Sequence, residues 1–158
     1  MISSMTWPLT GGCQCGAVRY GIGEPPLALY VCHCTDCQRQ SGSGFGMSMP
    51  VRRSALAVTK GEPRRWERTT PSGQVVECYF CADCGTRLFH VPARHPKIAN
   101  VKPGTLDDTR WLRPAGQMWT RSAQPWLAVP PGPLTFEEQP ADFKPMYEAW
   151  QEQALPGG

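Results

Sequence analysis

The chain has 158 residues, a formal net charge of +3 and an apolar fraction of 41%. This length favours one domain with enough apolar residues for a core. The positive charge is small and scattered, so it gives no basis for a nucleic-acid partner. No apolar run approaches the roughly 18 residues of a membrane span. The 16 glycines and 17 prolines favour turns and short strands over a helical bundle.

Alternating apolar residues predict a mainly β chain. In chain order, the predicted strands lie near residues 17–20, 45–51, 56–58, 75–80, 88–91 and 98–101. The segment 75–80 is apolar on both faces, which predicts a buried strand. A short helix is expected from near Thr35. A second is expected near the C-terminus, where an apolar stripe recurs at helical spacing with Pro145 near its start: Phe143, Met146, Tyr147 and Trp150.

The compartment bears on how the eight cysteines are interpreted. Residues 1–10 lack the basic and apolar regions of a secretory signal. We therefore expect a cytoplasmic protein, in which thiols stay reduced. Reduced, clustered cysteines favour metal binding over the alternative of a four-disulfide scaffold.

Seven cysteines fall into three tight groups: Cys13-Gln14-Cys15, Cys32-His33-Cys34-Thr35-Asp36-Cys37 and Cys81-Ala82-Asp83-Cys84. Thiolates suit zinc, copper(I) or iron–sulfur clusters, and these spacings differ from the ferredoxin motifs. A structural zinc has four protein ligands and a catalytic zinc has three, so seven cysteines match one site of each kind. Spacing leaves open which groups share a metal. Pairing the first group with the third keeps the middle triplet whole, whereas every other pairing splits it.

The cysteine groups and their flanking residues resemble one known family. The matching segments are Gly11-Gly12-Cys13-Gln14-Cys15-Gly16-Ala17-Val18-Arg19-Tyr20, Cys32-His33-Cys34-Thr35-Asp36-Cys37-Gln38-Arg39, Ser41-Gly42-Ser43, Phe80-Cys81-Ala82-Asp83-Cys84-Gly85-Thr86 and Gly104-Thr105-Leu106-Asp107-Asp108. They resemble the glutathione-dependent formaldehyde-activating enzyme family, which also includes centromere-protein-V-like proteins. The resemblance covers about residues 11–127. It implies a small, mostly β fold with two zinc ions, a structural one on Cys13, Cys15, Cys81 and Cys84 and a catalytic one on Cys32, Cys34 and Cys37.

The resemblance also implies a carbon–sulfur lyase whose type substrates are glutathione and formaldehyde. A zinc with three thiolates and an open position can bind a thiol and lower its pKa. That thiol sulfur would then be ready to add to an aldehyde carbon. The alternative is a non-catalytic, zinc-stabilised module that binds a thiol compound or a protein partner. A purely structural middle site would need a fourth ligand, for which His33, Cys78 or a side chain distant in the sequence are candidates. The oligomeric state stays open.

We expect a small single-domain β fold stapled by zinc, with a few short helices. We assign residues 1–10 to an N-terminal extension, residues 11–150 to a zinc-binding domain of the formaldehyde-activating type, and residues 151–158 to a tail.

Several residues near these motifs allow two interpretations. Strand alternation turns His33 away from its cysteine neighbours, which favours a supporting or surface role. Cys78 lies on a predicted strand and is expected to be a small core residue. His90 and His95 lack ligand spacing and are expected to be ordinary histidines.

Basic and aromatic residues offer weaker signals of a substrate site. Five arginines form either a patch for an acidic substrate or, as we favour, a solvated face: Arg52, Arg53, Arg64, Arg65 and Arg68. Gln117 stands where many relatives of the resembled family carry histidine, so a substrate contact there would imply a different preference. Around Arg121, the tryptophans Trp119 and Trp126 are expected in the core.

Overall fold

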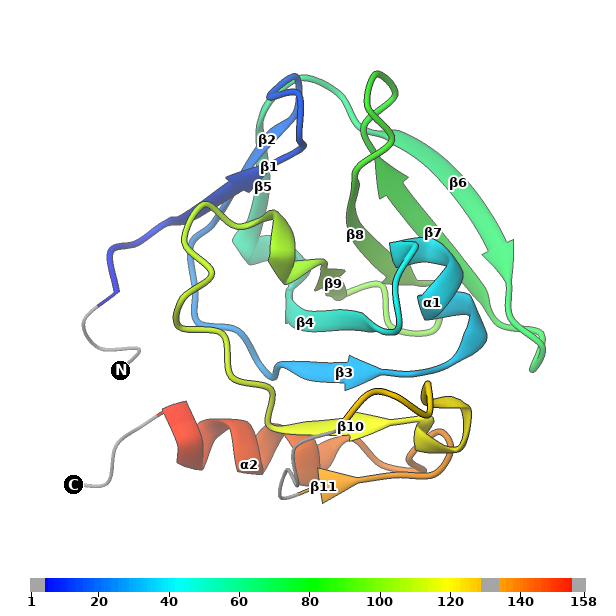
Figure 1. Ribbon diagram of the computed structural model, residues 1–158. Helices are drawn as coiled ribbons and strands as arrows, with labels where there is room; N and C mark the ends of the chain where they lie inside the picture. Colours follow the sequence, from blue (N-terminus) through cyan, green and yellow to red (C-terminus); the bar gives the residue numbers. More distant parts are fainter. Residues whose placement is uncertain (1–4, 129–133, 155–158) are drawn as a thin grey trace.

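The structure, a computed structural model, describes residues 5–128 and 134–154. Within these ranges the chain forms 11 strands and two α-helices, which confirms the predicted mainly β fold with a few short helices. The strands make one sheet of three and one of eight. Figure 1 shows the smaller sheet at the upper left and the larger one extending from the right of the molecule to its lower edge.

The small sheet is antiparallel and consists, in spatial order, of β1 (Leu9–Gly12), β2 (Arg19–Ile22) and β5 (Leu56–Lys60). Tyr20 and Ile22 are almost fully buried beneath it. The hairpin loop between β1 and β2 carries Cys13 and Cys15, so this sheet presents the first cysteine pair.

The large sheet consists, in spatial order, of β11 (Leu134–Thr135), β10 (Gly116–Met118), β3 (Tyr30–Cys32), β4 (Gly46–Arg52), β9 (Ile98–Val101), β8 (Arg87–Pro92), β7 (Val75–Phe80) and β6 (Arg64–Thr69). β10 is parallel to both β3 and β11, and the other neighbouring pairs are antiparallel. Cys32 ends β3, and the turn between β7 and β8 carries Cys81 and Cys84. The sheet therefore presents the other two cysteine groups.

The core lies between the two sheets and under the C-terminal helix. Its largest fully buried side chains include Leu29, Met49 and Phe89. α2 (Lys144–Ala154) runs beside β10 and β11 at the bottom of Figure 1. It buries Met146 and Trp150, and the Trp150 indole N–H donates to the Pro26 carbonyl at 3.2 Å.

Both predicted helices are confirmed. α1 (Thr35–Ser41) ends at Gly42, whose φ of 60° is the left-handed conformation typical of a helix C-terminus. In α2 the predicted stripe is present, although Phe143 precedes the helix. The helix extends through Ala154, so residues 151–154 of the expected tail are helical and Ala154 is buried. Residues 155–158 lie outside the described residues.

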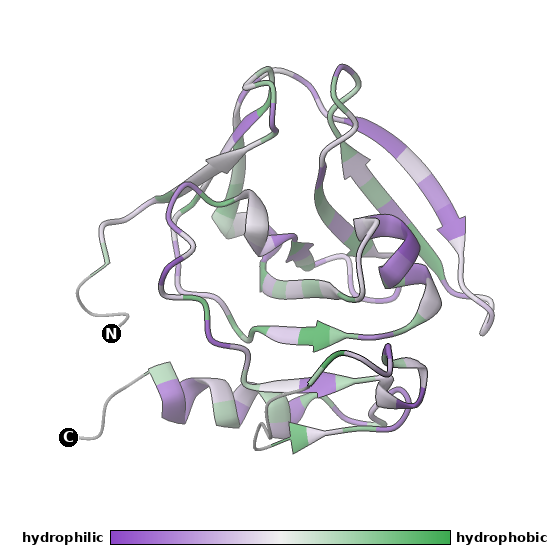
Figure 2. Ribbon diagram, viewed as in Figure 1, coloured by the Kyte–Doolittle hydropathy of each residue, from purple (hydrophilic) through white to green (hydrophobic). Residues whose placement is uncertain are grey.

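All six predicted strands are present, with ends moved by at most two residues. β1, β3, β6, β10 and β11 were not predicted. Figure 2 shows that the edge strand β6 is mostly hydrophilic. Its sequence therefore has no alternating apolar residues from which a strand could be predicted. The prediction that residues 75–80 form a fully buried strand is wrong: Val75 is 37% exposed and only Cys78 is fully buried. The segment also contains the charged Glu77, whose partly exposed carboxylate pairs with Arg65 of β6.

In the part of the chain that the structure describes, three single-turn 3-10 helices connect the strands: η2 (Arg53–Ala55), η3 (Pro103–Thr105) and η4 (Thr120–Ser122). α2 is the longer of the two described α-helices, with 11 residues, whereas a membrane span needs about 20. No helix in the described ranges is therefore long and apolar enough to cross a membrane.

Gly61, in the turn between β5 and β6, is predicted to be essential for the position of the first cysteine loop. It has a φ of 71°, and an added Cβ would lie 2.1 Å from the backbone oxygen of Ala17. Gly73 also has a positive φ, but nothing lies near its Cβ position. Gly61→Ala and Gly73→Ala should each lose roughly 1–2 kcal/mol through the left-handed backbone. The free energy of unfolding, measured with urea, should fall clearly further in Gly61→Ala, because its added Cβ collides with the backbone. Equal decreases in the two variants would contradict this account.

Candidate metal centre

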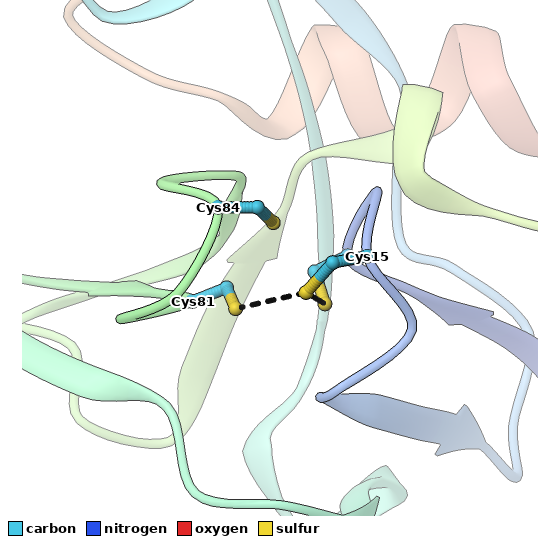
Figure 3. Close-up of side chains that lie close together, drawn as sticks. Cys15, Cys81 and Cys84 are labelled. Atoms are coloured by element: carbon cyan, nitrogen blue, oxygen red, sulfur yellow. Dashed lines mark hydrogen bonds between the residues drawn. The ribbon is translucent and has the colours of Figure 1, made fainter.

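The structure brings four cysteines of the first and third groups together: Cys13, Cys15, Cys81 and Cys84. Their sulfurs all lie within 4.8 Å of one another. The Sγ atoms of Cys13 and Cys15 are 3.6 Å apart, and those of Cys15 and Cys81 are 3.8 Å apart. A tetrahedral zinc with 2.3 Å bonds to sulfur separates its ligands by about 3.8 Å, so this donor set fits such an ion. Figure 3 shows the two loops meeting, with their cysteine side chains turned toward one another.

All eight cysteines are free thiols. The sulfur separations are far longer than the roughly 2.05 Å of a disulfide. The disulfide alternative is therefore rejected in favour of sites that can bind metal ions.

Each loop of the four-cysteine cluster turns at a glycine with positive φ. Gly16 follows Cys15 at a φ of 77°, and Gly85 follows Cys84 at 75°. The N–H of Gly16 donates to the Cys13 carbonyl at 3.1 Å, and that of Gly85 to the Cys81 carbonyl at 2.9 Å. Such turns bring the two cysteines of each loop to one point.

Nearby hydrogen bonds favour thiolate at Cys13 and Cys84 of this cluster. The Val18 N–H donates to the Cys13 sulfur at 3.2 Å. The Thr86 hydroxyl lies 3.2 Å from the Cys84 sulfur. That hydroxyl and then the Thr86 backbone N–H lower the pKa of Cys84 to about 5. Because thiolate is the form that ligates a metal, these contacts prepare the cluster for an ion.

The Gly104-Thr105-Leu106-Asp107-Asp108 segment ties the first cysteine loop to the rest of the fold. The Thr105 hydroxyl lies 2.7 Å from the Tyr20 hydroxyl, and the Asp107 carboxylate accepts from the Thr10 hydroxyl at 2.6 Å and pairs with Arg19. The motif therefore acts here through the β1–β2 hairpin.

The middle group forms a second cluster, in which the sulfurs of Cys32, Cys34 and Cys37 lie within 4.8 Å of one another. Cys34 is the N-cap of α1, and its sulfur accepts from the Cys37 N–H at 3.3 Å. Gly46 of β4 lets the strand approach, because an added Cβ would lie 3.1 Å from the Cys37 Cβ. The strand end, the helix start and a neighbouring glycine thus place three thiols at one point.

The three thiols hold their protons unequally. Contacts from the Cys32 and Cys37 thiols, followed by backbone N–H groups, lower the pKa of Cys34 to about 2. The corresponding contacts from Cys34 and Cys37, with burial, raise the pKa of Cys32. Cys34 at the helix N-terminus is therefore the first of the three to ionise.

Neither expected candidate for a fourth ligand joins this cluster. Among the described His, Cys, Asp and Glu side chains, only three contribute a ligand atom to the group. His33 is buried and turned away, with its Nε2 3.0 Å from the Gln117 Oε1. Its side chain is therefore not on the surface. Cys78 is buried on β7, as expected of a core residue.

A cleft of about 470 Å³ lies between the two cysteine clusters and is lined by Cys37 of one and Cys84 of the other. Lys102 and Arg87 also line it. A second pocket, of about 380 Å³ and mostly apolar, contains His33 and Gln117 but no cysteine. The cleft is therefore the space from which a small molecule reaches both clusters.

His90 is a buried, neutral side chain in contact with Arg87 of the cleft lining. The Arg87 Nη1 lies 3.3 Å from the His90 Nε2. Because guanidinium only donates, Nε2 accepts and the ring proton belongs on Nδ1. Burial, and then the positive charges of Lys102, Arg87 and Arg68, lower the pKa of His90 to about 2.

Two expectations about basic and aromatic residues need correction. Arg68 is mostly buried rather than on a solvated face, because its guanidinium reaches Asp36 of α1 at 2.7 Å; Arg52 and Arg65 instead form ion pairs with at least half of their own side chains exposed. Trp126 is 71% exposed, so the expectation of a core residue is wrong. It comes after η4 (Thr120–Ser122), and its ring lies over Gly44 at the surface. Trp119 does pack against the core.

Comparison with known proteins identifies the family. Residues 8–122 match the family described as the glutathione-dependent formaldehyde-activating enzyme, which is well over half of the chain. The chain belongs to this family. The resemblance read from the cysteine motifs is confirmed.

One relative and one solved structure are informative. A protein of Halomonas elongata, named as a candidate glutathione-dependent formaldehyde-activating enzyme, is 26% identical over 103 residues. That match covers 63% of this chain and 66% of the relative, slightly less than two thirds of its length. A crystal structure of a Rhodobacter sphaeroides protein, a Northeast Structural Genomics target, superimposes with a TM-score of 0.53 at 23% identity. It covers 65% of this chain and 92% of that protein, and it supports the fold.

We predict that metal content separates the two clusters. Cys15→Ser should lose the ion of the four-cysteine cluster, and Cys34→Ser should lose that of the three-cysteine cluster. Cys78→Ser should retain both, because Cys78 lies outside each group. Elemental analysis of the purified proteins gives the number of zinc ions per chain. Loss of an ion in Cys78→Ser would show that this thiol is a ligand.

His90 is predicted to make the fold sensitive to acid. Its pKa in the fold lies below the ordinary 6.5, so the unfolded chain binds this proton first and stability falls as the pH drops below about 6.5. Between about pH 7.5 and about pH 5 the wild type should lose on the order of 2 kcal/mol more than His90→Gln. Urea unfolding at each pH measures the difference, and metal release common to both proteins cancels.

The matched control for this measurement is His95→Gln, because His95 is exposed. It should follow the wild-type pH dependence. If His90→Gln also follows the wild type, His90 does not oppose protonation in the fold.

Proposed function

We propose that this protein is a zinc-dependent enzyme of the carbon–sulfur lyase type. Its substrate would be the adduct of a thiol such as glutathione with a small aldehyde such as formaldehyde. One observation carries the proposal: three cysteines converge without a fourth described ligand, next to a cleft that Cys37 lines. A cytoplasmic location, where glutathione and thiols are reduced, belongs to the same proposal.

We assign the four-cysteine cluster to a structural zinc. Four protein thiolates complete the tetrahedral coordination of zinc, and the sulfur separations of 3.6 and 3.8 Å suit it. Cys15 and Cys81 are 66 residues apart, so an ion there joins distant parts of the chain.

We assign the three-cysteine cluster to the catalytic zinc. A zinc bound by Cys32, Cys34 and Cys37 supplies a positive charge that stabilises the thiolate form of an added thiol. The donor set supports this role over carbonyl activation, since three thiolates leave the ion electron-rich. It also favours a soft sulfur as the added ligand.

The residues of this chain contribute position and electrostatics. The Cys37 N–H bonded to the Cys34 sulfur holds the helix start against the cluster. Burial lowers the pKa of Lys102, and the nearby Cys37 and Cys32 thiols act against this shift by favouring the charged ammonium. Phe45 and Met47 give the cleft an apolar stretch of wall.

The proposed reaction balances without a redox partner. The thiol sulfur forms a bond to the aldehyde carbon, the carbonyl π bond breaks, and the thiol proton passes to the oxygen. The product is an S-hydroxymethyl adduct when the aldehyde is formaldehyde. Breaking the carbon–sulfur bond in the reverse direction returns the thiol and the aldehyde.

Family membership and the name of the Halomonas relative support glutathione and formaldehyde as first substrates to test. Because Gln117 stands where many relatives carry histidine, other thiols and aldehydes should be tested as well. The Gln117 Oε1 lies 3.0 Å from the Nε2 of the buried His33, and its amide nitrogen lies 3.3 Å from the Thr135 hydroxyl.

The zinc-loaded protein should accelerate adduct formation between glutathione and formaldehyde, followed by NMR of the hydroxymethyl protons under exchange conditions. Cys34→Ser should lose at least about tenfold in rate, because the cluster loses its first thiolate to ionise. Cys78→Ser is the matched control and should keep the wild-type rate. Undiminished turnover in Cys34→Ser would show that the middle cluster is not the active site. Thiol binding without turnover would favour the binding module instead.

A further inference from the structure

The cleft between the two cysteine clusters has a one-sided charge. Its lining contains two cations, Lys102 and Arg87, and no Asp or Glu. The remaining lining is neutral polar, apolar or glycine, apart from Cys37 and Cys84. A charged ligand in this space therefore meets positive side chains.

Neither cation is paired with a carboxylate within residues 5–128 and 134–154. Lys102 Nζ lies 3.5 Å from the Ser48 hydroxyl. Arg87 contacts the neutral His90 at 3.3 Å and lies over the Trp66 ring at 5.7 Å. All three contacts leave the positive charge uncompensated.

An acidic group beside the three-cysteine cluster is already engaged. Asp36 pairs with Arg68 at 2.7 Å, and Arg68 contributes a further positive charge near His90. The lining of the cleft is therefore positive, with two cations and no carboxylate, even though the net charge of the whole chain is only +3.

The cysteine clusters themselves need some of this positive charge. A zinc with three thiolates has a net charge of −1, from +2 and three negative sulfurs. Lys102 and Arg87 could serve only to balance it. Two observations favour a ligand as well: both side chains line an open space rather than the cluster interior, and both are partly exposed there.

We propose that the cleft selects thiols that carry a carboxylate, and that Lys102 and Arg87 bind this carboxylate while the sulfur reaches the three-cysteine cluster. The proposal rests on the proposed function, since it assumes that a thiol binds there. Lys102 and Arg87 are positioning residues in this account. Neutral thiols of the same size would lack the second point of attachment.

The test compares 3-mercaptopropionate with its methyl ester, which is similar in size but uncharged. Both are titrated into protein whose zinc is replaced by cobalt, and the cobalt absorption bands report thiol binding without turnover. For each thiol, the dissociation constant of a variant is divided by that of the wild type, so that differences in thiol acidity cancel.

Lys102→Met should raise the dissociation constant of 3-mercaptopropionate about 10- to 100-fold, which corresponds to the loss of a charge-assisted hydrogen bond. It should change binding of the ester less than about twofold. Arg87→Met should act in the same direction. Lys97→Met is the matched control, because Lys97 is exposed and outside the cleft, and both thiols should bind it as they bind the wild type.

The outcomes separate the two proposals. If neither thiol perturbs the cobalt spectrum of the wild type, the proposed function itself fails. If both thiols bind and Lys102→Met weakens them equally, Lys102 only balances the cluster charge and the inference is overturned. If Lys102→Met cannot be loaded, Arg87→Met decides in the same way.

Discussion

The convergence of four sulfurs is the constraint on which the arrangement of the two sheets depends. Cys13 and Cys15 come from the loop of the small sheet, whereas Cys81 and Cys84 come from a turn of the large one. Bringing together residues 66 positions apart carries a loop-closure cost, which a bound ion can offset by on the order of 10 kcal/mol. A metal ion bound by this cluster would therefore link folding to metal binding.

Hydrogen bonds support the same junction independently of any ion. Tyr20, Thr105 and Asp107 connect the β1–β2 hairpin to the segment after β9. Gly11 allows this close approach, because an added Cβ would lie 2.5 Å from the Thr105 carbonyl oxygen. The small sheet is thus held in position both by these hydrogen bonds and by the cysteine cluster.

The second cluster differs because it is local. Its three sulfurs lie within one strand end and one helix start, so they need no long-range closure. This local group has three described ligands, and Cys37 faces an adjoining cleft. The two clusters therefore suit different chemical roles, one in holding the fold and one in meeting a ligand.

The predicted and observed features differ most where the chain is polar. The strands with alternating apolar residues were predictable because burial of one face sets their period. β6 was not, since an edge strand can be hydrophilic on both faces. The parallel pairing of β10 with β3 was not predictable either, because it joins segments that are distant in sequence. It is this pairing that buries Gln117 against His33.

The sequence by itself determined the mainly β class, the family and the three cysteine groups, because these depend on local spacing and residue type. Residue spacing alone left open which groups meet, since sulfurs distant along the chain can converge in several ways; the resemblance implied the grouping, and the tertiary structure shows it. It alone also placed Arg87 and Lys102 on the wall of one cleft. The physical reason is that strand order, which no local pattern encodes, decides which distant charges become neighbours.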